Sequence, residues 1–84
     1  MSQRRVYMYF FLRSGWHCQL LEADLKTALP RTFTFASADK VRELAQRAGG
    51  LKSTVDRQAF EYALSIGRGG VDLTLTEEQY RKLR

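Results

Sequence analysis

The chain has 84 residues, which provide for one hydrophobic core and exclude a second, so residues 1–84 are predicted to form a single domain. An apolar content of 44% excludes a disordered chain, and a single cysteine excludes a disulfide framework and favours a reducing, cytoplasmic location. The net charge of +5 suits a soluble surface and favours anionic partners only weakly.

Two strands joined by a tight turn are predicted at the start of the chain. The first is the aromatic-rich segment Val6–Leu12, which is too short for a membrane helix or a signal peptide. The return strand is Trp16–Ala23. Ser14 and Gly15 lie where a two-residue hairpin turn requires positive φ, so Arg13 is expected to face the first residue of the return strand.

The length of this turn determines which side chains share a face of the hairpin. A two-residue turn places Phe11 opposite Cys18 and Phe10 opposite Gln19, and side chains alternate between the faces along each strand. The face with Phe11 and Cys18 is predicted to be the core. The other face is predicted to be exposed and partly apolar, and its residues are Met8, Phe10, Leu12, His17 and Leu21.

A third strand and two helices are predicted next. After a loop over Asp24–Arg31, the alternating segment Thr32–Ala36 indicates a strand with both of its phenylalanines inward. Two helices follow, each with a favourable serine N-cap and a glycine stop, over Ser37 to Gly49 and Ser53 to Gly67.

Apolar residues at helical spacing predict the face by which the second helix packs on the sheet. They are Val55, Ala59, Tyr62, Ala63 and Ile66, widened by Phe60 and Leu64. A short strand over Val71–Leu75 follows. Thr76 and Gln79 then form a capping box for the last helix, with Leu75 and Tyr80 as its hydrophobic staple.

The element order is therefore β-β-β-α-α-β-α. Consecutive strands followed by helices indicate a two-layer α+β fold with a largely antiparallel sheet and helices on one face. The segment Leu73–Tyr80, preceded by Gly69 and Gly70, resembles the ends of small uncharacterised bacterial proteins, some of them carried on mobile elements. The resemblance implies a bacterial accessory role and assigns no activity and no site residues.

The residue types present disfavour catalysis, so no enzyme activity, catalytic residue, cofactor or metal site is predicted. His17 and Cys18 are strand neighbours that point to opposite faces, which disfavours a catalytic dyad. One histidine and one cysteine are too few for a structural zinc site.

Glu22 and Asp24 share a strand face and could form a pair of carboxylates, but two separately solvated acids explain their positions equally well. The glycine clusters follow helices, whereas phosphate loops precede them.

Self-association is the preferred functional hypothesis. The chain is predicted to be a small binding or accessory protein whose hairpin face with Met8, Phe10 and Leu12 contacts a second copy or another protein. An equally weighted interpretation is that the last helix or the loop Asp24–Pro30 covers this face within the chain. A role as a small enzyme subunit is a further alternative.

Nucleic-acid binding is the main alternative. Aromatic side chains on an open sheet stack on unpaired bases when arginines lie nearby, and Tyr7 is close in sequence to Arg4, Arg5 and Arg13. A helix-turn-helix over residues 41–66 is a second route, although its second helix has only Arg57 as a basic residue.

Overall fold

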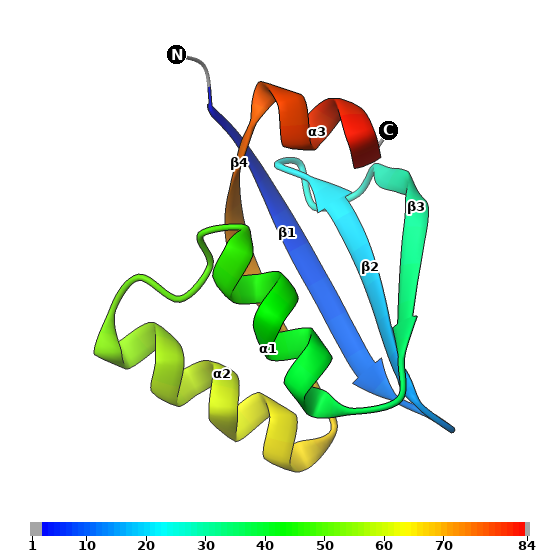
Figure 1. The fold of residues 1–84 in the computed structure, drawn as a ribbon, viewed down its shortest axis with the longest axis vertical. Coiled ribbons are helices and arrows are strands. Elements are labelled where there is room, and N and C mark those ends of the chain that lie inside the picture. The colour runs from blue at the N-terminus through cyan, green and yellow to red at the C-terminus, as the bar shows by residue number, and fades with distance from the viewer. Residues whose placement is uncertain (1–2, 84) are drawn as a thin grey trace.

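The computed structural model describes residues 3–83, which form one four-stranded antiparallel sheet with three helices against one face (Figure 1). The elements are β1 (Gln3–Leu12), β2 (Trp16–Glu22), β3 (Ala28–Phe35), α1 (Ala38–Arg47), α2 (Thr54–Ile66), β4 (Arg68–Thr76) and α3 (Glu77–Leu83). The predicted two-layer α+β class and the element order β-β-β-α-α-β-α are confirmed. None of the described helices has the length and apolar content needed to cross a bilayer.

The strands lie in the order β3-β2-β1-β4, so β1 and β2 are central and β3 and β4 are the edges. β3 begins four residues earlier than expected and includes Pro30, which an edge strand tolerates because its outer N–H groups need no partner in the sheet. The loop between α1 and α2 crosses the edge of β4, where the amide of Thr74 donates to the carbonyl of Ala48 at 2.9 Å. This contact partly covers the edge.

The turn between β1 and β2 is longer than predicted. Leu12 pairs with Trp16, so the loop has three residues, with positive φ at Ser14 and Gly15. The extra residue shifts the pairing by one position, and Phe10 lies opposite Cys18 instead of Gln19. A shift of one residue exchanges the faces of a strand. The predicted assignment of the β1 faces is therefore wrong.

The core lies between the sheet and the helices. Met8 and Phe10, which were expected on an exposed face, have no exposed surface. The ring of Phe10 meets that of Phe60 from α2 edge-on at 5.3 Å, and it is tilted relative to the ring of Trp16 at 6.1 Å. Val41 of α1 is also fully buried in this cluster. Burial of these side chains is the main driving force for packing the helices on the sheet.

The predicted packing face of α2 is correct for Phe60, Ala63 and Leu64 and wrong for the other apolar residues. Phe60 and Leu64 are buried against the sheet, whereas Val55, Tyr62 and Ile66 are 73%, 67% and 56% exposed. The helix is apolar on two opposite sides, and the spacing of its apolar residues alone does not indicate which side is buried. α2 packs chiefly on β4, and its inner face lies close enough to Gly69 that a side chain there would overlap Ala63.

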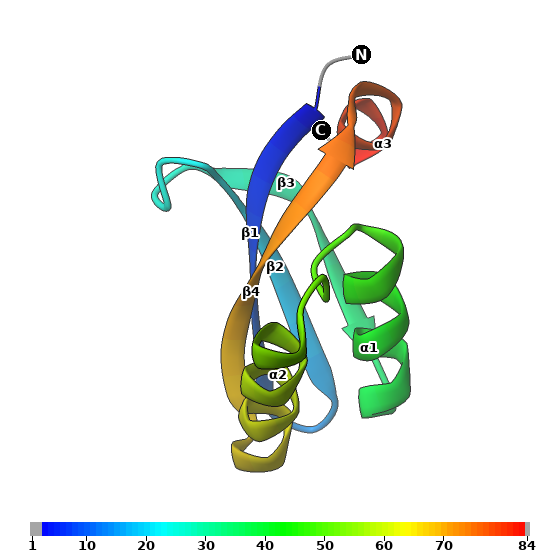
Figure 2. The same cartoon turned by 90° about the vertical axis from the view of Figure 1, so that its left-hand side faces the viewer.

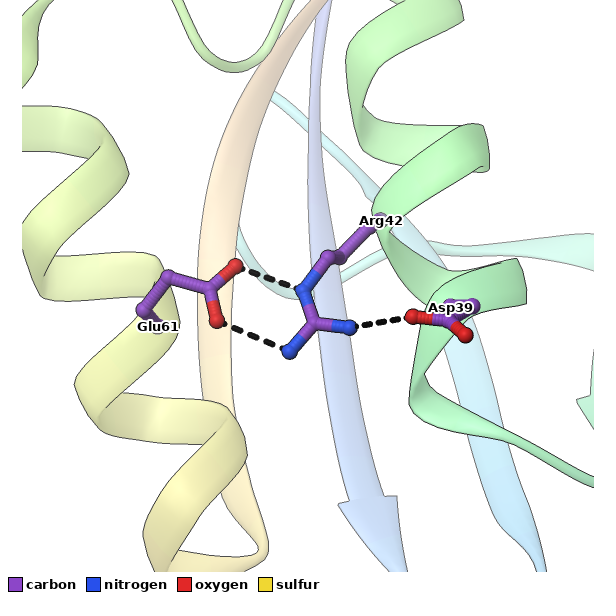
Figure 3. A network of polar contacts seen from close by, with 3 residues as sticks. All are labelled: Asp39, Arg42 and Glu61. Atoms are coloured by element: carbon purple, nitrogen blue, oxygen red, sulfur yellow. Dashed lines mark hydrogen bonds and ion pairs between the residues drawn. The ribbon is translucent and has the colours of Figure 1, made fainter.

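An ionic contact joins α1 to α2 on the surface (Figure 3). The Arg42 guanidinium donates to both carboxylate oxygens of Glu61, at 2.6 and 2.8 Å, and to Asp39 at 2.6 Å. The hydrogen bonds from Arg42 lower the pKa of Glu61. All three side chains are substantially exposed, so water and salt limit the contribution of this contact to stability.

The predicted helix ends are present with one difference. The Ser53 hydroxyl accepts from the amide of Asp56, and Thr76 and Gln79 exchange both hydrogen bonds of a capping box. Ser37 occupies the N-cap position of α1 without a hydrogen bond from its side chain. Gly49 and Gly67 have positive φ and end their helices.

The two sides of α2 are expected to differ in their contribution to stability. Leu64→Ala should lower the free energy of unfolding by about 2–4 kcal/mol, because it leaves a cavity in the core. Val55→Ala should change it by less than about 0.5 kcal/mol, since Val55 is 73% exposed. Urea unfolding at low protein concentration, followed by circular dichroism, measures both. Equal losses for the two variants would contradict this packing of α2.

Candidate binding surface

The face of the sheet that points away from the helices is the strongest candidate for a binding surface (Figure 2). Along β1, buried Val6, Met8 and Phe10 point toward the helices, so the residues between them point outward. The pairing of β1 with β2 and β4, and of β2 with β3, extends this alternation across the sheet. This open face includes Arg5, Tyr7, Tyr9, Phe11, His17, Gln19, Leu21, Thr32, Thr34, Arg68, Gly70, Asp72 and Thr74.

Aromatic rings form a continuous column along the middle of the open face. The ring of Tyr9 lies 5.8 Å from that of Phe11, which stacks on the His17 imidazole at 5.1 Å with 15° between their planes. The Nε2–H of His17 donates to the carbonyl of Arg13 at 2.9 Å, which orients the imidazole. Tyr9 is 41% exposed. The column therefore presents ring surface to solvent from the central part of the sheet.

Tyr7 extends this column toward β4. Its ring lies over Gly70, where a side chain would overlap the phenol group. An aromatic ring packed over a strand glycine covers backbone that would otherwise be bare. Gly70 thus lets the ring of Tyr7 lie against the sheet, with part of its surface still exposed.

A recess lies at the Tyr7 end of the open face. The loop between β2 and β3 borders it, and its volume is about 300 Å³, with a lining that includes Arg5, Tyr7, Leu25 and Asp72. Asp24 makes this loop compact by accepting hydrogen bonds from the amides of residues 26 and 27 and from a threonine hydroxyl. These bonds hold the pKa of Asp24 below its usual value. The recess is therefore bordered by a well-organised loop.

Basic residues lie at both ends of the column. Arg5 is beside Tyr7, and Arg68, which pairs with Phe11, lies at the other end near Arg13 in the hairpin loop. Within residues 3–83, Asp72 is the acidic residue of the open face. The face therefore has an excess of positive charge around its aromatic centre.

The structure separates the residues that the sequence suggested for binding. Of the proposed self-association surface, Met8 and Phe10 are in the core, Leu12 is 53% exposed beside the start of the hairpin loop, and His17 and Leu21 lie on the open face. Tyr7 and Arg5 from the nucleic-acid hypothesis lie side by side at one end of the open face, and Arg13 lies in the hairpin loop at the other end.

Arg4 does not belong to this group. Its guanidinium lies 4.1 Å above the ring of Tyr80 and 3.4 Å from the Glu77 carboxylate, so it faces α3. The alternation of side chains along β1 accounts for the separation of Arg4 from its neighbour Arg5.

A second depression of about 470 Å³ lies at the edge of β4. It adjoins the open face at Arg5 and Tyr7, and Lys52, Asp56 and Asp72 also line it. The two cations and two carboxylates balance each other. Because this lining has no net charge, it favours an anionic ligand less than the open face does.

Glu22 and Asp24, like the helical acids Glu43 and Glu61, are engaged separately. Glu22 accepts a hydrogen bond from the hydroxyl of Tyr80, Asp24 organises its own loop, Glu61 binds Arg42 and Glu43 binds Lys40. No cluster of three or more potential metal ligands occurs among residues 3–83. Cys18 is buried, and burial raises the pKa of its thiol to about 11.

Comparisons with protein families, with curated proteins and with solved structures found no match for this chain. The interpretation of the open face therefore depends on its own geometry and charge.

Tyr7 and Gly70 are expected to be energetically coupled. Gly70→Ala should destabilise the fold, because the new methyl group displaces the ring of Tyr7 from β4. The same substitution should cost about 0.5–1 kcal/mol less in a Tyr7→Ala background, where the overlap is absent. A double-mutant cycle from urea unfolding gives this coupling free energy. Additive losses would show that the ring does not lie over Gly70.

The thiol of Cys18 is expected to be unreactive in the folded protein. A pKa of about 11, against 9.0 for a free thiol, leaves roughly 100-fold less thiolate at pH 8. Reaction with Ellman's reagent should be slower by at least this factor in buffer than in urea. Between pH 9 and 11 the unfolded chain loses this proton first, so the free energy of unfolding should fall as the pH rises. Equal rates in both solvents would contradict the burial of Cys18.

Proposed function

We propose that this protein binds single-stranded nucleic acid on the open face. The observation that supports this proposal best is the aromatic column of Tyr7, Tyr9 and Phe11 with arginines at both ends. Base stacking on aromatic rings contributes about 1–3 kcal/mol per base, and nearby basic groups neutralise the phosphates. The rings follow one another along β1, with Arg5 at one end and with Arg13 and Arg68 at the other, an arrangement that suits an extended nucleic-acid backbone.

Charge favours nucleic acid over a second copy as the occupant of this face. Packing two open faces together would place arginines of one copy near arginines of the other, and Asp72 is the acid available to offset them among the described residues. Like charges brought together without compensation oppose association. Hydroxyl, amide and imidazole groups beside the rings, such as Gln19 and Thr34, suit a hydrated polar ligand.

Unpaired strands fit the surface better than a duplex does. Stacking on a flat sheet needs bases that are not already paired, which single strands provide. The helix-turn-helix alternative is disfavoured, because the outward side of α2 presents Val55, Tyr62 and Ile66 and would offer no basic contact to a groove.

The buried thiol of Cys18 suits a reducing compartment, and we therefore place the protein in the cytoplasm. A non-catalytic accessory role in a bacterial cell is the wider context that we propose, in line with the resemblance of Leu73–Tyr80 to the ends of small bacterial proteins. Fractionation of the native host cells tests this location, and recovery of the protein outside the cytoplasm would overturn it.

Fluorescence anisotropy with labelled single-stranded RNA, single-stranded DNA and duplex DNA tests the proposal. Binding to the single strands should be detectable at 20 mM salt and should weaken as salt rises. Tyr9→Ala should reduce the affinity about tenfold through the loss of one stacked base. Arg68→Ala should lower it less and reduce the salt slope by about 0.7.

Matched controls come from exposed residues outside the open face. Tyr62→Ala and Arg47→Ala remove one tyrosine and one arginine from the helices and should leave the affinity unchanged. The relative affinity for RNA and DNA reveals which strand is preferred. Absence of binding at 20 mM salt, or equal losses in the controls, would overturn the proposal.

A further inference from the structure

The outward side of α2 presents an apolar strip that stays largely exposed in the structure of residues 3–83. The strip consists of Val55, Ala59, Tyr62 and Ile66, all of them exposed. Phe60 and Leu64 on the opposite side of the helix already anchor α2 to the core. The strip is therefore not needed to hold α2 on the sheet.

The spacing of the strip is symmetric. Its residues follow one another at intervals of four, three and four, which is the spacing of the core positions of a coiled coil. The sequence of intervals is the same in both directions. Two copies of α2 running antiparallel can therefore place Val55 opposite Ile66 and Ala59 opposite Tyr62 in one register.

We propose that this strip forms a homodimer interface in which two α2 helices pack antiparallel about a twofold axis. In that register the large ring of Tyr62 lies over the small side chain of Ala59 on the partner copy, twice by symmetry. The β-branched residues at the two ends face each other. A twofold axis makes one surface complementary to itself, and alternating large and small residues allow such helices to approach closely.

The charges beside the strip permit this contact. Gln58 and Ser65 flank it on one side, and Asp56 and Ala63 flank it on the other. Asp56 of one copy would lie near Ala63 of the other, so no like charges meet. The strip is thus a neutral region on a chain of net charge +5, where two copies can approach without repulsion between their basic residues.

The size of the interface sets its expected strength. A 13-residue helix is about 20 Å long, so a pair of such helices buries less than the roughly 1,200 Å² of a standard interface. Leu12, which donates its amide to Gly67 at the end of α2, adds apolar surface next to the strip. We therefore expect a weak dimer, which forms only at high protein concentration.

This dimer is independent of the proposed nucleic-acid site. The strip lies on α2, on the helix side of the sheet, and the open face lies on the other side (Figure 2). Ala59 of the strip also lines the depression at the edge of β4, together with Arg5 and Tyr7 of the open face, so this depression lies between the two surfaces.

Sedimentation equilibrium from 1 µM to 1 mM tests the dimer directly. The wild-type chain should change from monomer to dimer over this range, and Tyr62→Glu should remain monomeric. Tyr9→Glu, the matched substitution on the open face, should still form dimers. Circular dichroism confirms that both variants are folded. A monomer at 1 mM, or a dimer lost in Tyr9→Glu and kept in Tyr62→Glu, would overturn the proposal.

Cross-linking tests the antiparallel register. Val55 of one copy lies next to Ile66 of the other and about 16 Å along the helix from the second Val55. A bis-maleimide shorter than this distance should link an equal mixture of Val55→Cys and Ile66→Cys chains and neither variant alone. The buried Cys18 does not compete. Equally strong linking within the Val55→Cys sample would indicate a parallel pair and contradict the register.

Discussion

The pairing of β1 with β2 through a three-residue loop determines what each face of the sheet can do. β1 is apolar on both sides, so either set of alternating residues could in principle face the helices. The observed pairing buries Met8 and Phe10 and leaves Tyr7 and Tyr9 outside. Burying tyrosines would require hydrogen-bond partners for their hydroxyl groups, whereas methionine and phenylalanine need none. The loop length and the cost of burying polar groups thus favour the same register.

With that register in place, the molecule has two exposed surfaces of different chemistry. The open face combines aromatic rings with arginines, and the strip on α2 is apolar and nearly uncharged. Hydrated polar ligands suit the first surface, and close packing of like chains suits the second. Both surfaces depend on the same core, since Phe60 connects α2 to Phe10 of β1. Loss of that core contact would affect both proposed roles.

The sequence predicted the element types well because their signals are local. The capping box at Thr76 and the glycine stops at Gly49 and Gly67 depend on neighbouring residues, and the structure contains each of them. The faces of β1 and α2 were not predictable by the same means. Both elements are apolar on two sides, so the choice of buried side depends on tertiary packing that local patterns do not contain. The hydroxyl groups of Tyr7 and Tyr9 were the available signal for the outer face of β1.

Cross-strand NOEs between backbone protons of β1 and β2 measure the register most directly. We expect contacts that pair Phe10 with Cys18 and Tyr9 with Gln19. Contacts that pair Phe11 with Cys18 and Phe10 with Gln19 would instead show a two-residue turn. That result would place Met8 and Phe10 on the outside and remove the basis for the open face described here.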